Sequence, residues 1–170
     1  MGFGQSSMLL KVGFILIIVA LVIQILGVAL PYWYQKENSS GTSVNGGLWK
    51  YCSETLNVKK CIDMENAADW IEACRAFQII GLLILVASLV LCIIVLFIKN
   101  DMKVLKLINW ILCFCACGFI IIGIIIYGAE ASGVFEEYSG AFAITIISGI
   151  VALVAGVVCL LDWMGKGTPA

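Results

Sequence analysis

Residues 76–98 read AFQIIGLLILVASLVLCIIVLFI, and this stretch decides the fold class of the 170-residue chain. It contains no charged residue, and a helix of about 20 such residues crosses the hydrocarbon core of a bilayer. Three further stretches share this length and apolar character, namely residues 12–30, 107–129 and 141–161. The sequence therefore predicts an all-α membrane protein with four transmembrane helices.

The overall composition supports this class and excludes several others. Hydrophobic residues make up 62% of the chain, charged residues 12%, and the mean hydropathy is +1.09. A soluble domain of this length cannot bury so much apolar surface. The chain has no His, which excludes His-based acid–base chemistry, Ser-His-Asp triads and His-ligated metal sites. We therefore expect one domain over residues 1–170, no enzyme activity, no cofactor or metal, and no nucleic-acid partner, since the net charge is −1.

The distribution of charge predicts the orientation in the membrane. Four spans place both termini on one side, together with residues 99–106. That side carries five lysines against two aspartates, a net charge of +3. The segment 31–75 has five basic and six acidic residues, a net of −1, and the segment 130–140 has three glutamates, a net of −3. By the positive-inside rule, both termini are cytosolic and the two longer segments are extracellular in a multi-pass protein of the plasma membrane.

Three of the cysteines fall in the first outer segment, where the environment is oxidising. Cys52 and Cys61 are separated by eight residues, which indicates a disulfide-closed hairpin. Closing so short a loop contributes about 2–3 kcal/mol in the chain-entropy model. Pairing of either residue with Cys74 is the alternative. We favour the Cys52–Cys61 bridge and expect Cys74, beside Arg75, to be free and buried.

The first outer segment also carries signals of local structure. Residues 44–52, VNGGLWKYC, are typical of a strand, with a Gly-Gly pair that suits a turn or a close backbone approach. Residues 64–73 are predicted to form a helix that continues into the second span. Asp63 would cap this helix.

Together these residues resemble the signature of the claudin and peripheral myelin protein superfamily. The matching residues are Trp33, then Gly47-Leu48-Trp49, then Cys52 and Cys61, and finally Arg75 before the second span. The resemblance implies a left-handed four-helix bundle with a small extracellular antiparallel β-sheet built from both outer segments. In that fold Trp33 and Trp49 would anchor the sheet to the bundle, and Arg75 would pair with backbone or acidic groups beneath it.

The resemblance also implies a function. Such a protein would contact the lipid bilayer, self-associate within one membrane or across two, and seal or tune paracellular permeability at cell junctions. The chain departs from barrier claudins in its short second outer segment and in the tail from Gly165 to Ala170, which offers no PDZ-type C-terminal ligand. An auxiliary subunit of a larger ion channel or receptor, built on the same fold, is therefore the alternative.

Asp63 is the candidate for a pore charge. By resemblance, the residues that follow the second signature cysteine line the pore of channel-forming claudins, and a carboxylate there favours cations. Strand alternation places Asp63 on the same face as Cys61. Lys59 and Lys60 oppose the effect, but at a hairpin tip they should be screened by hydration. The competing interpretation is the helix cap described above.

Four further positions carry smaller hypotheses. Asn38 begins the glycosylation sequon Asn-Ser-Ser. Cys159, near the cytosolic end of the fourth span, is a candidate for palmitoylation. Gln24, inside the first span, is predicted to hydrogen-bond to another helix. The small residues between 141 and 156 are predicted to pack inside the bundle, with a self-association face as the alternative.

Overall fold

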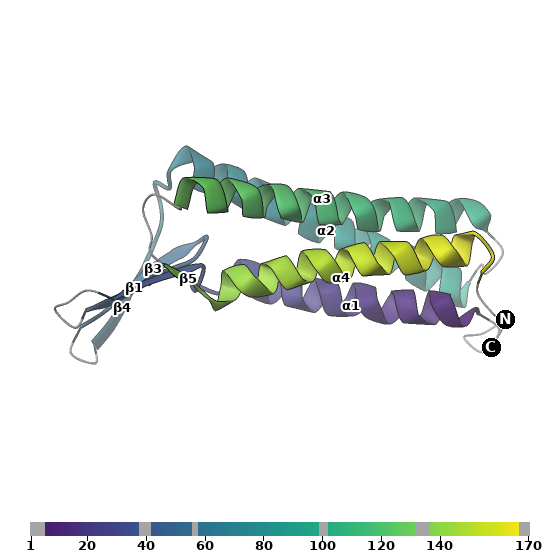
Figure 1. Cartoon of the computed structure of the whole chain (residues 1–170), viewed down its shortest axis with the longest axis horizontal. Helices are drawn as coiled ribbons and strands as arrows, with labels where there is room; N and C mark the ends of the chain where they lie inside the picture. Colours follow the sequence, from purple (N-terminus) through teal and green to yellow (C-terminus); the bar gives the residue numbers. More distant parts are fainter. Residues whose placement is uncertain (1–5, 38–41, 56–57, 99–101, 132–136, 167–170) are drawn as a thin grey trace.

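A computed structural model describes residues 6–37, 42–55, 58–98, 102–131 and 137–166. Its helices form a bundle with a β-sheet at one end, and α1 begins and α4 ends at the other (Figure 1). Each of the four helices is long and apolar enough to cross a membrane, which confirms the predicted multi-pass membrane protein. Their bounds are α1 Met8–Ala29, α2 Asp69–Phe97, α3 Lys103–Ala131 and α4 Gly140–Trp163.

The bundle is closed, because α1 and α3 each pack against both α2 and α4. Small side chains make this approach possible, and α4 supplies more of them than any other helix. Ser148 is fully buried and its Oγ donates to the carbonyl of Ala20 on α1 at 2.9 Å. Large aliphatic side chains point the other way, and Leu83 and Ile125 are each 61% exposed to what would be lipid. The α4 residues Ala141, Thr145, Ser148, Gly149, Ala152 and Gly156 are all buried, as the packing interpretation predicts.

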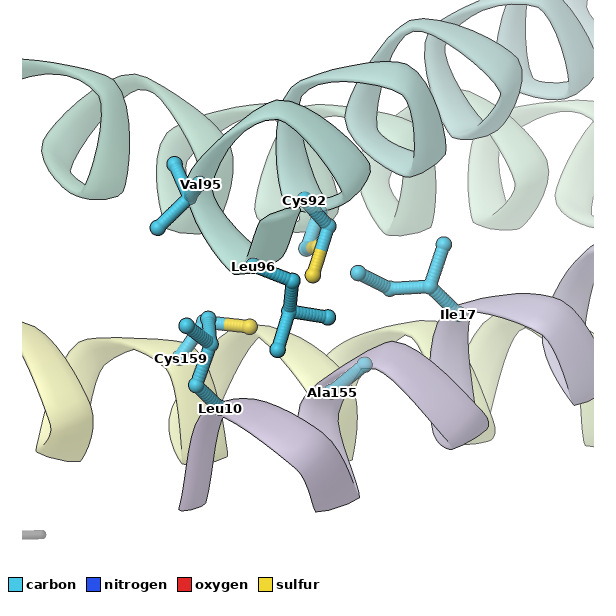
Figure 2. Packing of buried hydrophobic residues seen from close by; sticks show 8 residues of the cluster. Leu10, Ile17, Cys92, Val95, Leu96, Ala155 and Cys159 are labelled. Atoms are coloured by element: carbon cyan, nitrogen blue, oxygen red, sulfur yellow. The ribbon is translucent and has the colours of Figure 1, made fainter. Parts of the chain in front are cut away.

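The half of the bundle farther from the sheet has a core of aliphatic and thiol side chains. In Figure 2, residues from α1, α2 and α4 point toward one another in this cluster. Gly13 on α1 is essential to the fit, because a Cβ there would lie 2.8 Å from Sγ of Cys159. The cluster comprises Leu10, Ile17, Cys92, Val95, Leu96, Cys113, Ala155 and Cys159.

The sheet is antiparallel and has five strands in the order β4-β3-β2-β1-β5. Because β5 comes from the connection between α3 and α4, both outer segments contribute to one sheet. This confirms the fold expected from the resemblance. The bounds are β1 Tyr34–Glu37, β2 Ser43–Gly46, β3 Lys50–Thr55, β4 Val58–Asp63 and β5 Glu137–Tyr138.

The helix predicted over residues 64–73 begins later than expected, and its predicted cap is wrong. The helix α2 begins at Asp69, and its N-cap residue, Ala68, makes no side-chain cap. Asp63 instead ends strand β4 and stands opposite Lys50 of β3. Pairing with β3 keeps this part of the chain extended, and it continues one residue further, since the amide of Met64 donates to the carbonyl of Trp49 at 2.9 Å.

Candidate functional site

The two signature tryptophans cap the end of α1. A helix leaves its last carbonyls without intrahelical partners, and α1 ends at Ala29. The indole Nε1 of Trp33 donates to the carbonyl of Gly27 at 2.8 Å. Nε1 of Trp49 donates to the carbonyl of Val28 at 2.9 Å. Two residues separated in sequence thereby satisfy adjacent carbonyls and fix the outer segment to the first span.

Trp33 also contacts α3 and α4. Its fully buried ring lies 4.7 Å from that of Tyr127 on α3 and 5.8 Å from that of Phe142 on α4, measured between centroids. Trp70 at the start of α2 packs edge-on against Tyr127, with 5.5 Å between centroids. Aromatic pairs of this kind contribute about 0.5–1.5 kcal/mol each beyond their burial. Aromatic residues of α2, α3 and α4 therefore meet beneath the sheet in one cluster with Trp33, which is itself bonded to α1.

The glycine pair permits two close approaches. A Cβ on Gly46 would lie 2.6 Å from Cζ of Tyr34, whose ring crosses β2 at this point. A Cβ on Gly47 would lie 2.6 Å from Cα of Pro31 and 2.7 Å from the carbonyl oxygen of Leu30. The glycine pair was predicted to form a turn or to permit a close backbone approach, and these contacts support the close approach.

Arg75 connects the second span to the sheet through backbone rather than through an acidic group. Its Nε donates to the carbonyl of Leu48 at 2.7 Å, and a guanidinium nitrogen lies 3.5 Å from the carbonyl of Met64. The guanidinium also lies 4.9 Å from the ring centroid of Trp49. Leu48 itself is fully buried. The Gly47-Leu48-Trp49 motif thus contacts α1 on one side and α2 on the other.

The predicted disulfide is confirmed. Cys52 and Cys61 form a bridge and stand directly opposite each other in β3 and β4. Cys74 is free and buried, and its thiol donates to the carbonyl of Gly123 at 3.3 Å. The bridge therefore locks the outer hairpin, and the third outer cysteine serves helix packing.

Three charged side chains of the outer hairpin have partners. Oδ1 of Asp63 lies 3.6 Å from Nζ of Lys50, although both side chains are largely exposed. Nζ of Lys59 donates to the hydroxyl of Tyr32 at 2.8 Å and lies 5.1 Å from that ring's centroid. This hydrogen bond raises the pKa of Lys59. Lys59 is exposed, as expected near the tip of a hairpin, and its ammonium group is also bonded to Tyr32.

The interhelical bond predicted for Gln24 is present. Its Nε2 donates to Oε1 of Gln78 on α2 at 2.7 Å, and Nε2 of Gln78 donates to the carbonyl of Ile120 on α3 at 3.2 Å. Gln78 escaped the sequence analysis although it is an amide inside an apolar span, the same signal that identified Gln24.

Cys159 is not placed for palmitoylation. It is only 3% exposed, and its Sγ accepts from Nδ2 of Asn109 at 3.6 Å inside the bundle. A thioester-linked acyl chain has no room there, so the hypothesis is corrected. Asn38 and the end of the tail lie outside the described residues. In the part of the chain that the structure describes, no three His, Cys, Asp or Glu side chains are placed to hold a metal ion.

A buried ion pair at the far end of the bundle was also missed. Nζ of Lys106 on α3 lies 2.8 Å from Oδ2 of Asp162 on α4, and the hydroxyl of Ser7 donates to the same carboxylate. Oγ of Ser7 in turn accepts from the amide of Leu10 and caps α1. The position of Asp162 at the very end of an apolar span was the available signal.

Comparison with known proteins agrees with this arrangement. The model of the PMP-22/EMP/MP20/Claudin family matches residues 6–159, which include all four spans almost completely and the whole sheet. No individual curated protein matches the chain. Because the match covers far more than half of the sequence, the chain belongs to the PMP-22/EMP/MP20/Claudin family.

Proposed function

We propose that this protein is a non-enzymatic adhesion and structural protein that self-associates at cell–cell contacts and seals or tunes paracellular permeability. The observation that supports this function is the rigid attachment of the sheet. Trp33, Trp49 and Arg75 connect it to α1 and α2 by hydrogen bonds, and the aromatic cluster continues to α3 and α4. A surface held in advance at a fixed orientation loses little entropy when it docks on a neighbour.

The test uses epithelial cells that lack their own claudins. The fluorescently tagged protein should concentrate where two expressing cells touch, form continuous strands in freeze-fracture images, and change transepithelial resistance. An even distribution over the surface, with no strands and unchanged resistance, would refute the proposal. Gly118→Ala is a suitable control variant, because nothing lies within 4 Å of a Cβ at this position.

The proposed orientation places the helix ends that carry Lys103, Lys106 and Asp162 in the cytosol, with the sheet outside. The basic excess of that side supports this orientation. We predict that an epitope tag after Ala170 is stained only after permeabilisation, whereas a tag inserted between Asn38 and Gly41 is stained on intact cells. Staining of the C-terminal tag on intact cells would contradict the orientation.

The second candidate function is that of an auxiliary subunit of a larger channel or receptor. Its support is the short connection between Ala131, which ends α3, and Gly140, which begins α4. The connection is eight residues long, and Glu137–Tyr138 of β5 form a strand within the part that the structure describes, so little surface is left to reach an opposing cell. Affinity purification under mild detergent distinguishes the two functions. An auxiliary subunit brings a larger membrane protein in fixed stoichiometry, and a junctional protein brings copies of itself.

A further inference from the structure

Four polar side chains from three helices form a ring inside the half of the bundle farther from the sheet. Oγ of Ser88 on α2 donates to Oδ1 of Asn109 on α3 at 2.8 Å, and Nδ2 of Asn109 donates to Sγ of Cys159 on α4 at 3.6 Å. Sγ of Cys113 on α3 lies 3.1 Å from Oγ of Ser88 and is hydrogen-bonded to Cys159. All four residues are at most 3% exposed, so each finds its partners within the bundle.

The order of the hydrogen bonds in this ring is fixed by the number of protons. The hydroxyl of Ser88 has one proton, which it donates to Asn109. The thiol of Cys113 therefore donates to Ser88. The bond between the two thiols then takes its proton from Cys159, whose sulfur accepts from Asn109. Each member donates once and accepts once, and the two sulfur atoms are direct neighbours.

The backbones of α3 and α4 approach closely at this level. A Cβ on Gly156 would lie 3.2 Å from Cβ of Cys113, and Gly156 precedes Cys159 by one turn on the same face of α4. Cys92 of α2 belongs to the same cluster, and Figure 2 shows its sulfur and that of Cys159 both pointing into it. Cys92 is bonded to Asn109, so it is a buried thiol close to the pair.

Polar side chains connect the nearer end of the bundle to the ring. Asp162 follows Cys159 by three residues on α4, and Lys106 precedes Asn109 by three residues on α3. These two charged residues form the buried ion pair described above. About one helical turn therefore separates the ion pair from the ring, a rise of about 5 Å. The proposed orientation places this end in the cytosol, where thiols are kept reduced.

We propose that Cys113 and Cys159 are a peroxide-sensitive thiol pair that closes into a disulfide and locks α3 to α4. Hydrogen peroxide, a small uncharged oxidant, converts one thiol into a sulfenic acid and releases one water. The sulfur of the other thiol then displaces the hydroxyl group, which leaves with the thiol proton as a second water. The two thiols together lose two electrons and two protons, and the peroxide is reduced to water.

The ring distinguishes this pair from inert buried cysteines. A thiol surrounded only by aliphatic groups reacts poorly, because the nucleophile is the thiolate. Here Asn109 and the neighbouring thiol supply donors that stabilise the negative charge developing on sulfur. The lock operates whichever of the two functions proposed above the protein performs.

Mass spectrometry of the full chain in membranes tests the bond directly. The membranes are treated with hydrogen peroxide, remaining thiols are blocked with N-ethylmaleimide, and the unreduced protein is digested with chymotrypsin, which can cleave after Phe114 and so separate Cys113 from Cys115. The expected product joins Cys113 to Cys159 and is several times as abundant as any product joined through Cys92. A pair joined mainly through Cys92, or free thiols at both positions after peroxide treatment, would overturn the proposal.

Thermal unfolding in detergent micelles gives an independent readout. The peroxide-treated wild type should unfold about 5–10 °C above the untreated protein, because the new bond joins positions far apart in the sequence. Cys113→Ser keeps a polar hydrogen in the ring and should abolish this shift, whereas Cys92→Ser is the matched control and should retain it. An equal shift in Cys113→Ser would show that another modification causes it. If Cys113→Ser does not fold, the peptide pairs of the wild type decide.

Discussion

At the residue scale, one methyl group on Gly47 decides whether the sheet fits onto α1. A Cβ there would lie 2.6 Å from Cα of Pro31 and 2.7 Å from the carbonyl oxygen of Leu30, both main-chain atoms. Neither can move without displacing the end of the helix. We expect Gly47→Ala to reduce the free energy of unfolding by about 1–3 kcal/mol.

The measurement is denaturant or thermal unfolding in detergent micelles, with Gly118→Ala as the control. Gly118 lies within α3 with open space around its missing Cβ, so alanine there should be neutral or stabilise the helix by about 0.5–1 kcal/mol. Equal losses of stability in the two variants would show that close approach is not the role of Gly47.

Tyr34 provides a pH-dependent test of the same region. Its ring is buried against β2, and burial, followed by the nearby Tyr51, raises its pKa from 10.0 to about 12. A raised folded-state pKa means that its contribution to stability is complete below pH 10 and is lost as the pH rises toward 12. The free energy of unfolding of Tyr34→Phe should therefore fall by about 2 kcal/mol less than that of the wild type over this rise in pH. An unchanged slope of stability between pH 10 and pH 12 would contradict the assignment.

The identity of the signature residues could be predicted from the sequence, but their chemistry could not. Trp33 and Trp49 were recognised as anchors by resemblance alone. Their indole nitrogens bind carbonyls 6 and 21 residues away, and this depends on where α1 ends and how the chain turns back. No local pattern encodes that geometry. The close packing at Gly47 likewise arises between segments that meet only in the folded molecule.

At the element scale, the spans were predictable because a bilayer imposes a minimum length on an apolar helix. The predicted bounds differ from those of the structure mainly where polar residues extend a helix beyond the membrane core, as at Asp69 in α2. The strands were less predictable. Residues 44–52 were expected to form one strand, but the chain leaves the sheet after Gly46 and re-enters at Lys50. The interruption lets Leu48 and Trp49 reach the bundle.

A polar contact between elements predicts a measurable coupling. Gln24 and Gln78 are both fully buried and share a hydrogen bond of 2.7 Å between α1 and α2. Replacing either with Leu leaves its partner without this bond in an apolar environment, at a cost of about 0.6–2 kcal/mol. Gln78→Leu should cost more, since Gln78 also binds the carbonyl of Ile120.

The double variant, Gln24→Leu with Gln78→Leu, separates coupling from simple loss of packing. Its loss of stability should be smaller than the sum of the two single losses by about 0.5–2 kcal/mol. Unfolding in mixed detergent micelles provides the three values. Strict additivity would mean that the two amides do not stabilise each other.

At the scale of the whole molecule, the number of spans and the difference in net charge between the two sides can be predicted from the sequence, because both follow from composition along the chain. The ion-pair partner of an individual charge cannot be predicted in this way. It depends on the register of β3 and β4, which places Asp63 opposite Lys50, and on the tertiary fold that brings Lys59 to Tyr32. The pore hypothesis therefore concerns a charge pair rather than an isolated carboxylate.

This pairing leads to a test of ion selectivity. If the outer face lines a paracellular path, Lys50 and Asp63 at 3.6 Å largely cancel each other, since the Debye length at physiological salt is about 8 Å. The wild type should then have only a weak preference for cations. Lys50→Gln should strengthen this preference, because it leaves the carboxylate of Asp63 without its counter-charge. Asp63→Asn should abolish or reverse it.

Dilution potentials across an epithelial monolayer that lacks its own claudins measure these changes. The double variant, Lys50→Gln with Asp63→Asn, removes one charge of each sign and should return the potential close to that of the wild type. Lys166→Gln, beyond the end of α4 and away from the sheet, should have no effect. Continuous strands with the same potential in every variant would show that Asp63 does not face the permeating ions.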